Sequence, residues 1–355
     1  MLRVLMSFGD VLTSGTSVRA RSRSIVGAIR WDAWYGAAGS SERTAVEATL
    51  GPAEFQSRAP DFAVPISHTS IRIDGGTQAE IDREIRLASQ AGIDYWAYCF
   101  YSLDSPMMNA WKLHQISAIR DRMKWCLLLP SFAFFESEML SSIDRYVGYM
   151  IQSTYQRVLG GRPLLFVLDD ATPAARLRAG IDMLRRTCTI ANGGNPYIAI
   201  MSWSPLHTRQ EALAAGADAI SAYSVQSPKA TANYNDLDRA MRAEWAEMAE
   251  AGIATIPLAV TGKDRRPRVK TPVPWETGRQ QPMVGYNQYF VPGRPEQIGR
   301  HVRAAVDWVD AHPADCPARC SIIYSWNECD EGGSTLLPTR GQGETILKAI
   351  GRALR

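Results

Sequence analysis

Strand-like apolar runs alternate with helical segments along almost the whole of the 355-residue chain. The predicted strands cover 24–30, 93–101, 124–129, 163–168, 197–202, 219–223, 253–260 and 322–324. The predicted helices cover 78–90, 108–122, 138–159, 173–189, 206–215, 234–251, 295–311 and 343–354. Continuous apolar strands that alternate with helices are typical of a parallel sheet covered by helices. Eight such units predict an α/β fold of the (β/α)₈ (TIM) barrel type, with an open doubly wound sheet as the alternative.

The same helix-to-strand junction recurs, which supports a repeated module. Ala-Gly pairs at 91–92, 215–216 and 251–252 separate a predicted helix from the next strand. Glycine readily adopts the left-handed conformation that ends a helix, and recurrence of the unit indicates repeated αβ modules. No linker divides the chain, so we predict one barrel domain at 24–355, preceded by an N-terminal tail at 1–23.

The composition excludes several classes of protein. With 46% hydrophobic and 21% charged residues, the chain has the composition of a globular protein. A net charge of +3 gives no reason to expect a nucleic-acid partner. No run approaches the roughly 20 apolar residues of a membrane span, and the N-terminal residues make a poor signal peptide. The sequence favours a cytoplasmic protein, leaves a secreted or periplasmic one open, and indicates no oligomeric state.

Cysteines and histidines show no spacing typical of a metal site. The six cysteines are interpreted as buried thiols, although Cys316 and Cys320 are close enough in sequence to pair in an oxidising compartment. The five histidines are scattered. Neither a G-x-G-x-x-G after the first strand nor a G-x-S-x-G occurs, which argues against a dinucleotide site and a serine hydrolase. We expect no metal and no cofactor, with a divalent ion at Asp169, Asp170 and a glutamate as a minor alternative.

Aromatic and carboxylate side chains follow the ends of several predicted strands. In a (β/α)₈ barrel the active site lies at the carboxyl ends of the strands, on the loops that follow them. This rule selects ten candidate substrate-binding residues: Asp32, Trp34, Tyr35, Tyr98, Tyr101, Asp169, Trp203, Tyr223, Trp326 and Asn327. Aromatic faces can stack on sugar rings, so we expect a carbohydrate substrate. Packing inside the barrel explains Trp34 and Trp203 equally well, and Asp169 could instead hold a neighbouring loop.

Glu328 and Glu331 follow the last predicted strand on a Gly-rich loop. Even in an extended chain their backbones lie within roughly 11 Å of each other. Such a pair can act as acid and base when its surroundings separate the two pKa values. A solvated acidic loop is the alternative interpretation.

Two predicted strand-to-helix loops, 32–76 and 261–293, are unusually long, and such loops are often functional. The second carries five cations, Lys263, Arg265, Arg266, Arg268 and Lys270, followed by aromatic residues. A basic, aromatic lid of this kind favours an anionic glycan. A solvated basic loop explains the same pattern.

The segment 326–332, W-N-E-C-D-E-G, with Leu337-Pro338 after it, resembles the N-E-W-x-E-G signature of glycoside hydrolase family 99 and its WbsX-like relatives. Segments 26–28 and 34–36 are similar to the opening G-A-x-x-x-x-W-Y-G of that family, and segments 92–94 and 162–164 also resemble it. Cys329 stands where the family usually has tryptophan.

This resemblance implies retaining, endo-acting cleavage of an α-mannoside-type bond in a polysaccharide. It implies that Glu328 is the base acting on the sugar's 2-hydroxyl, which attacks C1 to give a 1,2-anhydro intermediate. Glu331 is then the acid/base and needs a raised pKa. The WbsX-like relatives imply an alternative, a glycosyltransferase or transglycosylase of polysaccharide biosynthesis. A glycan-binding barrel without catalysis is the third hypothesis.

Overall fold

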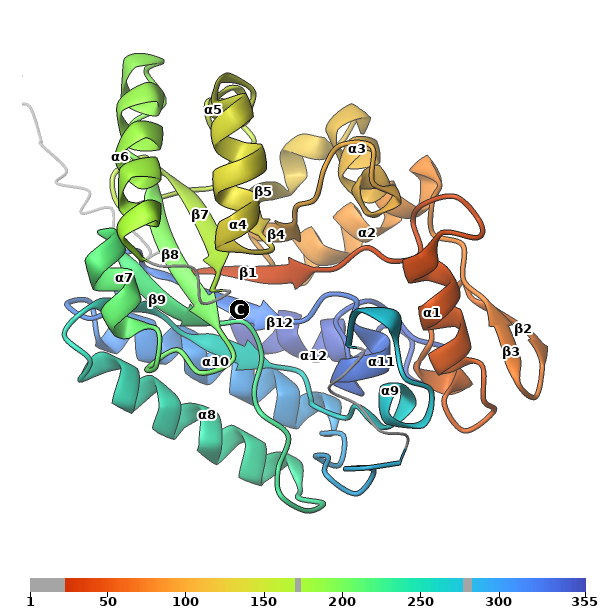
Figure 1. Ribbon diagram of the computed structural model, residues 1–355. Helices are drawn as coiled ribbons and strands as arrows, with labels where there is room; N and C mark the ends of the chain where they lie inside the picture. Colours follow the sequence, from red (N-terminus) through yellow and green to blue (C-terminus); the bar gives the residue numbers. More distant parts are fainter. Residues whose placement is uncertain (1–22, 170–173, 277–282) are drawn as a thin grey trace, which may run out of the picture.

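A nearly closed barrel of parallel strands lies at the centre of the molecule (Figure 1). The computed structural model describes residues 23–169, 174–276 and 283–355. The barrel strands, in chain order, are β1 (Ile25–Arg30), β4 (Tyr95–Cys99), β5 (Lys124–Leu129), β7 (Arg162–Leu168), β8 (Tyr197–Ser202), β9 (Ala219–Ala222), β10 (Ala254–Ile256), β11 (Leu258–Val260) and β12 (Cys320–Tyr324). Apart from Arg23, the predicted tail lies outside the described residues.

The predicted strand 253–260 is divided in two at Pro257. Proline has no N–H to donate to a neighbouring strand, and it interrupts the ladder here. β10 pairs with β9, whereas β11 pairs with β12, and β12 pairs in turn with β1. The ring therefore runs from β1 through the whole sheet and back to β1, which confirms the predicted (β/α)₈ barrel in a single domain.

Helices cover the outside of the barrel (Figure 1). The long ones are α2 (Gln78–Gln90), α3 (Asn109–Ile116), α5 (Ile143–Met150), α6 (Ala174–Ile190), α7 (Arg209–Ala215), α8 (Tyr234–Ala249), α10 (Pro295–Ala311) and α12 (Thr345–Leu354). Helix α2 has the predicted bounds, since the Thr77 hydroxyl accepts a hydrogen bond of 3.2 Å from the Glu80 N–H and caps the first turn. Gly92, Gly216 and Gly252 all have the left-handed conformation expected at the repeated junctions.

Two predicted helices are shorter in the structure. The prediction for 108–122 was wrong after Ile116, where Ser117 takes an extended conformation. The prediction for 138–159 was wrong after Met150, because the next residues join the sheet. The Gln156 N–H donates to the Trp125 carbonyl at 2.7 Å, and β6 (Arg157–Val158) pairs with β7. Backbone pairing with strands distant in sequence outweighs the local helical pattern there.

The segment 32–76, expected to be irregular, contains regular structure. It holds α1 (Ser41–Leu50) and a hairpin of β2 (Val64–Ser67) and β3 (Ser70–Arg72). In Figure 1, α1 lies beside α9 (Arg266–Lys270) and α11 (Cys329–Gly332), at the end of the barrel toward which β1 and β12 point. The remaining short elements are η1 (Gln56–Arg58), η2 (Pro106–Met108), η3 (Arg120–Arg122), α4 (Phe132–Phe134), η4 (Phe135–Met139), η5 (Leu140–Ser142) and η6 (Pro274–Glu276).

All six cysteines are free and buried, so Cys316 and Cys320 are separate thiols. Among the described residues, the helices are all too short or too polar to cross a membrane.

Candidate active site

The turn after β12 holds both predicted catalytic glutamates. The Trp326 N–H donates to the Ile29 carbonyl at 2.8 Å, which ties the start of the turn to the end of β1. Glu328 precedes the single turn α11, Glu331 lies within it, and Arg268 contacts both carboxyl groups. Gly333 ends α11 with φ +74°, and a Cβ there would come within 2.7 Å of the Asp264 Cβ. Glycine is therefore required for the turn to close in this way.

The carboxyl group of Glu328 contacts tyrosine hydroxyls. The side chain is 3% exposed. Tyr223 donates to Oε1 at 2.5 Å, and Tyr324 donates to Oε2 at 3.2 Å. Burial, together with the negative charge of Glu331, raises the pKa of Glu328 to about 8. These surroundings favour the protonated form of Glu328 more than those of an ordinary exposed glutamate do.

The carboxyl group of Glu331 contacts cations instead. Lys263 Nζ donates to Oε1, Arg268 Nη1 donates to Oε2 at 2.5 Å, and Arg265 Nε lies 3.8 Å from Oε1. Burial favours the neutral acid, but these cations outweigh it and hold the pKa of Glu331 well below its usual range. The sequence argument needed a raised pKa at Glu331, and the free protein has the opposite.

Arg268 joins the two glutamates and fixes the turn between them. Its guanidinium makes two hydrogen bonds to Asp330, at 2.9 and 3.0 Å, and Nη2 lies 3.6 Å from Glu328 Oε2. The side chain is almost fully buried and lies 5.5 Å from the ring of Trp31 and 5.7 Å from that of Trp275. The described part of the segment 261–293 thus reaches into the site through Arg268, which contacts both glutamates.

Each of the five lid cations that suggested an anionic glycan is paired with a carboxylate of the protein. The pairs are Lys263–Glu331, Arg265–Glu276, Arg266–Asp264, Arg268–Asp330 and Lys270–Glu54. Their charge is compensated within the molecule, which removes the reason for expecting an anionic substrate.

Four of the predicted substrate-binding residues follow the ends of barrel strands. Tyr223 contacts Glu328, and its ring lies 5.4 Å from that of Trp203, which is 43% exposed. Tyr101 is partly buried and accepts a hydrogen bond of 3.0 Å from Trp31 Nε1. Asp169, at the end of β7, is partly buried and its N–H donates to the Met201 carbonyl. Asp170 lies outside the described residues.

Asn327 and Asp32 connect the turn to β1 rather than facing the rim. Asn327 Oδ1 accepts from the Trp31 N–H at 2.9 Å, and its Nδ2 donates to Asp32 Oδ1 at 2.9 Å. Asp32 also accepts from Arg30. Burial raises the pKa of Asp32 to about 6 despite that cation. These two residues position the glutamates from beneath.

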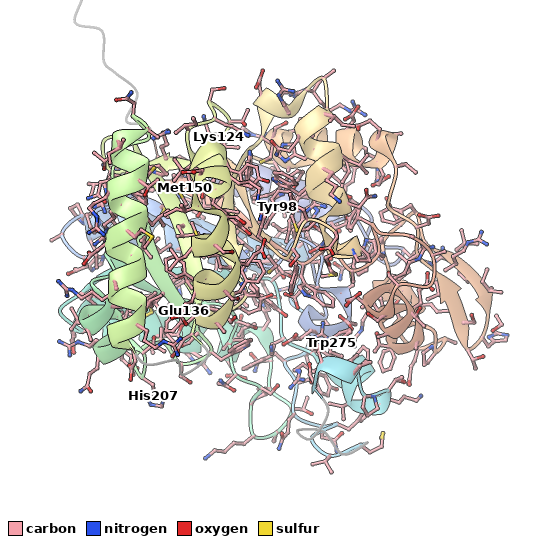
Figure 2. The ribbon with its side chains drawn as sticks, turned by 45° about the horizontal axis from the view of Figure 1, so that its top comes forward. Tyr98, Lys124, Glu136, Met150, His207 and Trp275 are labelled. Carbon is pink, nitrogen blue, oxygen red and sulfur yellow. The ribbon has the colours of Figure 1, made fainter. Side chains whose placement is uncertain are left out.

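Trp34, Tyr35, Tyr98 and Trp326 are at most 1% exposed and pack within the fold. Figure 2 labels Tyr98 in the interior of the molecule, where its hydroxyl group lies 3.1 Å from Nδ1 of His114 on α3, and it labels Trp275 near α9. Trp326 Nε1 and the Tyr35 hydroxyl both donate to Glu84, each at 2.7 Å. The expectation that these four aromatic residues form sugar platforms does not fit their positions, because packed rings offer no face to a ligand.

The sequence analysis missed the charges buried beneath the site. Arg30 lies among aromatic rings, 4.4 Å from that of Trp96, and forms an ion pair of 2.8 Å with Glu84. Both side chains are fully buried. An arginine that ends the otherwise apolar run SIVGAIR was the available signal. A buried cation requires a buried partner, so that signal predicts the ion pair without naming Glu84.

Among the described residues, no group of three or more histidine, cysteine or carboxylate side chains could hold a metal ion. The side chains gathered at the turn are the two glutamates, the tyrosine hydroxyls and the lid cations.

Comparison with known proteins gives a structural match only. No family model matches the sequence, and no curated protein matches it. Two solved structures of a GH99 endo-α-mannosidase from Bacteroides thetaiotaomicron are similar to the chain. The structure in complex with BIS-TRIS-propane has a TM-score of 0.54 at 12% identity, over 93% of this chain and 96% of that one. The other has a TM-score of 0.50 at 11% identity, over 88% and 87%. The fold resembles that of a family 99 enzyme. The resemblance inferred from sequence motifs therefore agrees with the three-dimensional fold.

Proposed function

We propose that this protein is a retaining glycoside hydrolase that cleaves α-mannoside-type bonds within a polysaccharide. Glu328 and Glu331 form its acid–base pair. The main support is that these neighbouring carboxyl groups have pKa values displaced in opposite directions. Such a separation is typical of acid–base pairs in active sites. The fold of the endo-α-mannosidase structures supports the substrate class.

The proposed reaction uses the sugar's own 2-hydroxyl as nucleophile. A base removes the proton of this hydroxyl, its oxygen attacks C1, and the bond from C1 to the leaving oxygen breaks. The acid protonates that leaving oxygen. The resulting carboxylate then takes a proton from water, which opens the 1,2-anhydro ring at C1, and the first carboxyl group returns the proton to O2. This route differs from the more common one through a glycosyl–carboxylate intermediate.

The assignment of roles conflicts with the charges of the free protein. The resemblance gives the base role to Glu328 and the acid role to Glu331, but the free protein keeps the proton on Glu328. On this assignment, sugar binding must transfer a proton to Glu331 and weaken its contact with Lys263. The converse assignment needs no such transfer.

The leaving group of the substrate separates these assignments. We would measure kcat/KM, which reports the step in which the leaving group departs, on aryl α-mannosides with good and poor leaving groups for wild type, Glu328→Gln and Glu331→Gln. Loss of the acid is tolerated when the leaving group needs no protonation, whereas loss of the base is not. We expect Glu331→Gln to retain activity only on good leaving groups and Glu328→Gln to lose at least about 100-fold on both kinds. The reverse pattern would exchange the roles.

Glu296→Gln provides the matched control, because Glu296 is an exposed glutamate that also pairs with an arginine, Arg352. Wild-type activity in both catalytic-site variants would overturn the proposal. The ion pairs of Glu331 favour one competing function, a glycan-binding barrel without turnover. Binding of an α-linked glycan with no release of reducing ends would support that function, and thermal stabilisation by a nucleotide sugar would instead support a transferase.

A further inference from the structure

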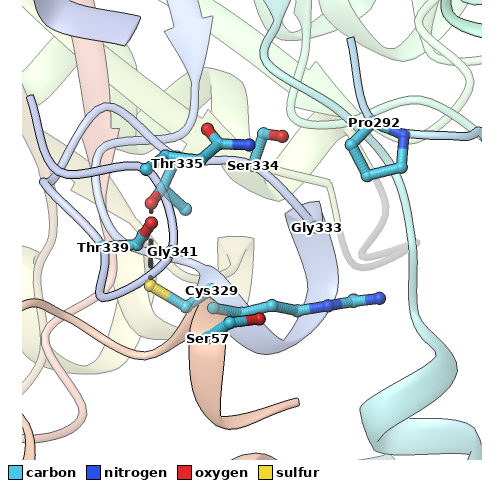
Figure 3. A pocket seen from close by; sticks show the side chains of 10 residues that line it. Ser57, Pro292, Cys329, Gly333, Ser334, Thr335, Thr339 and Gly341 are labelled. Atoms are coloured by element: carbon cyan, nitrogen blue, oxygen red, sulfur yellow. Dashed lines mark hydrogen bonds between the residues drawn. The ribbon is translucent and has the colours of Figure 1, made fainter. Parts of the chain in front are cut away.

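A cavity of about 340 Å³ lies against the catalytic turn (Figure 3). The side chains or backbone of Cys329, Ser334, Thr335 and Thr339 line its inner part, and the exposed Ser57 also borders it. The described residues whose side chains bond to the carboxyl groups of Glu328 and Glu331 do not line it. The cavity is therefore separate from the surroundings of the acid–base pair.

The lining carries hydrogen-bonding groups that the described part of the protein leaves unused. Ser334 is 4% exposed, and its hydroxyl oxygen has no hydrogen-bond partner among the described residues. The buried Oε1 of Gln342 is unpaired in the same way. Buried polar atoms in native structures are normally paired, so two of them bordering one cavity point to a polar ligand.

The chemistry of the lining selects the class of ligand. Among the described lining residues there is no carboxylate to hold a cation and no aromatic ring to stack on a base. Arg58 is the cation there, and its Nη2 already donates to Asp264 at 2.6 Å. What remains is serine and threonine hydroxyls and one amide, which can both donate and accept hydrogen bonds. A neutral polyhydroxylated molecule matches this set.

We propose that this cavity binds one neutral monosaccharide unit. Its volume is near the lower end of the range of about 300 to 1,000 Å³ typical of small-molecule sites, which fits a single small ligand. The inference concerns binding alone, so it does not require the protein to be a hydrolase.

A sugar in this cavity would contact the same turn that carries the glutamates. Cys329 lies between them in the chain, and Gly333 to Thr335 directly follow α11. The turn is anchored from the other side as well, since the Thr261 hydroxyl donates to the Ser334 carbonyl at 2.6 Å. A bound sugar would therefore contact the turn that carries Glu328 and Glu331 without touching either carboxyl group.

The test is a titration of the full chain with methyl α-D-mannoside, methyl β-D-glucoside and sodium sulfate, in which saturation-transfer NMR detects binding. We expect saturable binding of at least one of the two sugars and none of sulfate. Ser57→Tyr places a large side chain at the exposed edge of the cavity and should weaken sugar binding at least tenfold. Ser137→Tyr, at an exposed serine of η4, is the control and should bind like wild type.

One further variant makes each outcome decisive. Weaker binding by Ser57→Tyr assigns the bound sugar to this cavity rather than to the site around Glu328 and Glu331, even if no glycan is ever cleaved. If Ser57→Tyr lowers the melting temperature, Gln342→Leu replaces it, and we expect weaker binding again. Absence of saturable sugar binding, preference for sulfate, or equal binding by wild type and both cavity variants would overturn the proposal.

Discussion

Glu328 and Glu331 are the same type of residue on one helical turn, and their neighbours give them different protonation states. Two tyrosine hydroxyls surround the carboxyl group of Glu328, whereas Lys263 and Arg268 surround that of Glu331. Burial acts on both in the same direction, so the difference comes from the partner charges. The protonation states of the two glutamates are thus set by Tyr223 after β9, Tyr324 of β12, and the lid cations Lys263 and Arg268.

The pH dependence of kcat/KM reports the role of Glu328. If Glu328 is the base, activity rises as pH increases through about 8, the pKa of its carboxyl group. The hydrogen bond from Tyr223 lowers that pKa, so we expect Tyr223→Phe to move the rise to higher pH. Tyr149→Phe, whose ring packs on Trp111 and Trp125, should leave the midpoint unchanged. A decrease in activity through pH 8 in wild type would identify Glu328 as the acid.

Glu328 also affects the pH dependence of stability. Between its ordinary pKa of 4.5 and about 8, the folded protein keeps a proton that the unfolded chain has released. This contribution lowers the free energy of unfolding as pH rises through that window, by an amount on the order of 1 kcal/mol for each pH unit. We therefore expect Glu328→Gln to gain stability relative to wild type as pH rises from 5 to 8, measured by urea unfolding. The exposed Glu344→Gln is the control, and a constant difference from wild type would contradict the raised pKa.

The lowered pKa of Glu331 changes the pH dependence of stability in the opposite direction. Its ion pairs add stability that is fully present above pH 4.5, the ordinary pKa of glutamate, and is lost as pH falls toward its folded pKa. It therefore adds no slope between pH 5 and 8, so it does not obscure the contribution of Glu328 to the difference between Glu328→Gln and wild type in that window.

At the scale of elements, the ion pair of Arg30 on β1 with Glu84 on α2 joins the barrel to its first long helix. Glu84 also accepts from Tyr35 and Trp326, so one carboxylate links three segments. Glu84→Gln leaves a buried guanidinium with less compensation, and we expect a loss of roughly 3 to 5 kcal/mol in urea unfolding. Glu296→Gln makes the same chemical change at an exposed pair and should cost less than about 1 kcal/mol. Equal losses in the two variants would mean that the buried ion pair stabilises the fold no more than the exposed one.

Elements with strong local patterns were predictable from the sequence. The barrel strands are continuous apolar runs, and α2 combines a threonine cap with regular apolar spacing, so its bounds were correct. The segment 151–159 failed because Tyr155 and Gln156 bond to distant strands, and such contacts leave no periodic signal in the sequence. The split at Pro257 could have been anticipated from the missing N–H of proline.

The candidate site was predictable as a location but only partly as a set of contacts. The rule on strand ends brought Tyr223 and the two glutamates to one rim. It could not separate an exposed aromatic residue, such as Trp203, from a buried one, such as Trp326, whose indole donates to Glu84 of α2, because one residue of difference in register reverses the direction of a side chain. Nor could it show that Arg268 pairs within the site, since partner choice depends on tertiary structure.

At the scale of the whole molecule, the reactivity of the buried cysteines reports global unfolding. All six are buried thiols, distributed over the strands β4, β5 and β12, the helices α6 and α11, and the loop before β12. Burial raises the pKa of several of them, for example that of Cys329 to about 12, so the folded protein has few reactive thiolates. We expect Ellman's reagent to detect fewer than about one thiol in the native protein and all six after denaturation. Detection of four thiols after denaturation without reductant would indicate a disulfide.

The pairing of β1 with β12 determines when the site forms during folding. Trp31 and Asn327, whose hydrogen bond holds the catalytic turn, are 296 positions apart in the chain. Contacts between such distant residues form slowly, because a very long loop must be closed before they contribute stability. A refolding molecule can complete most of its strand pairs before this closure, yet it has no assembled glutamate pair until the two ends of the barrel meet. Recovery of activity should therefore follow the slowest refolding phase, and the regain of secondary structure should come before it.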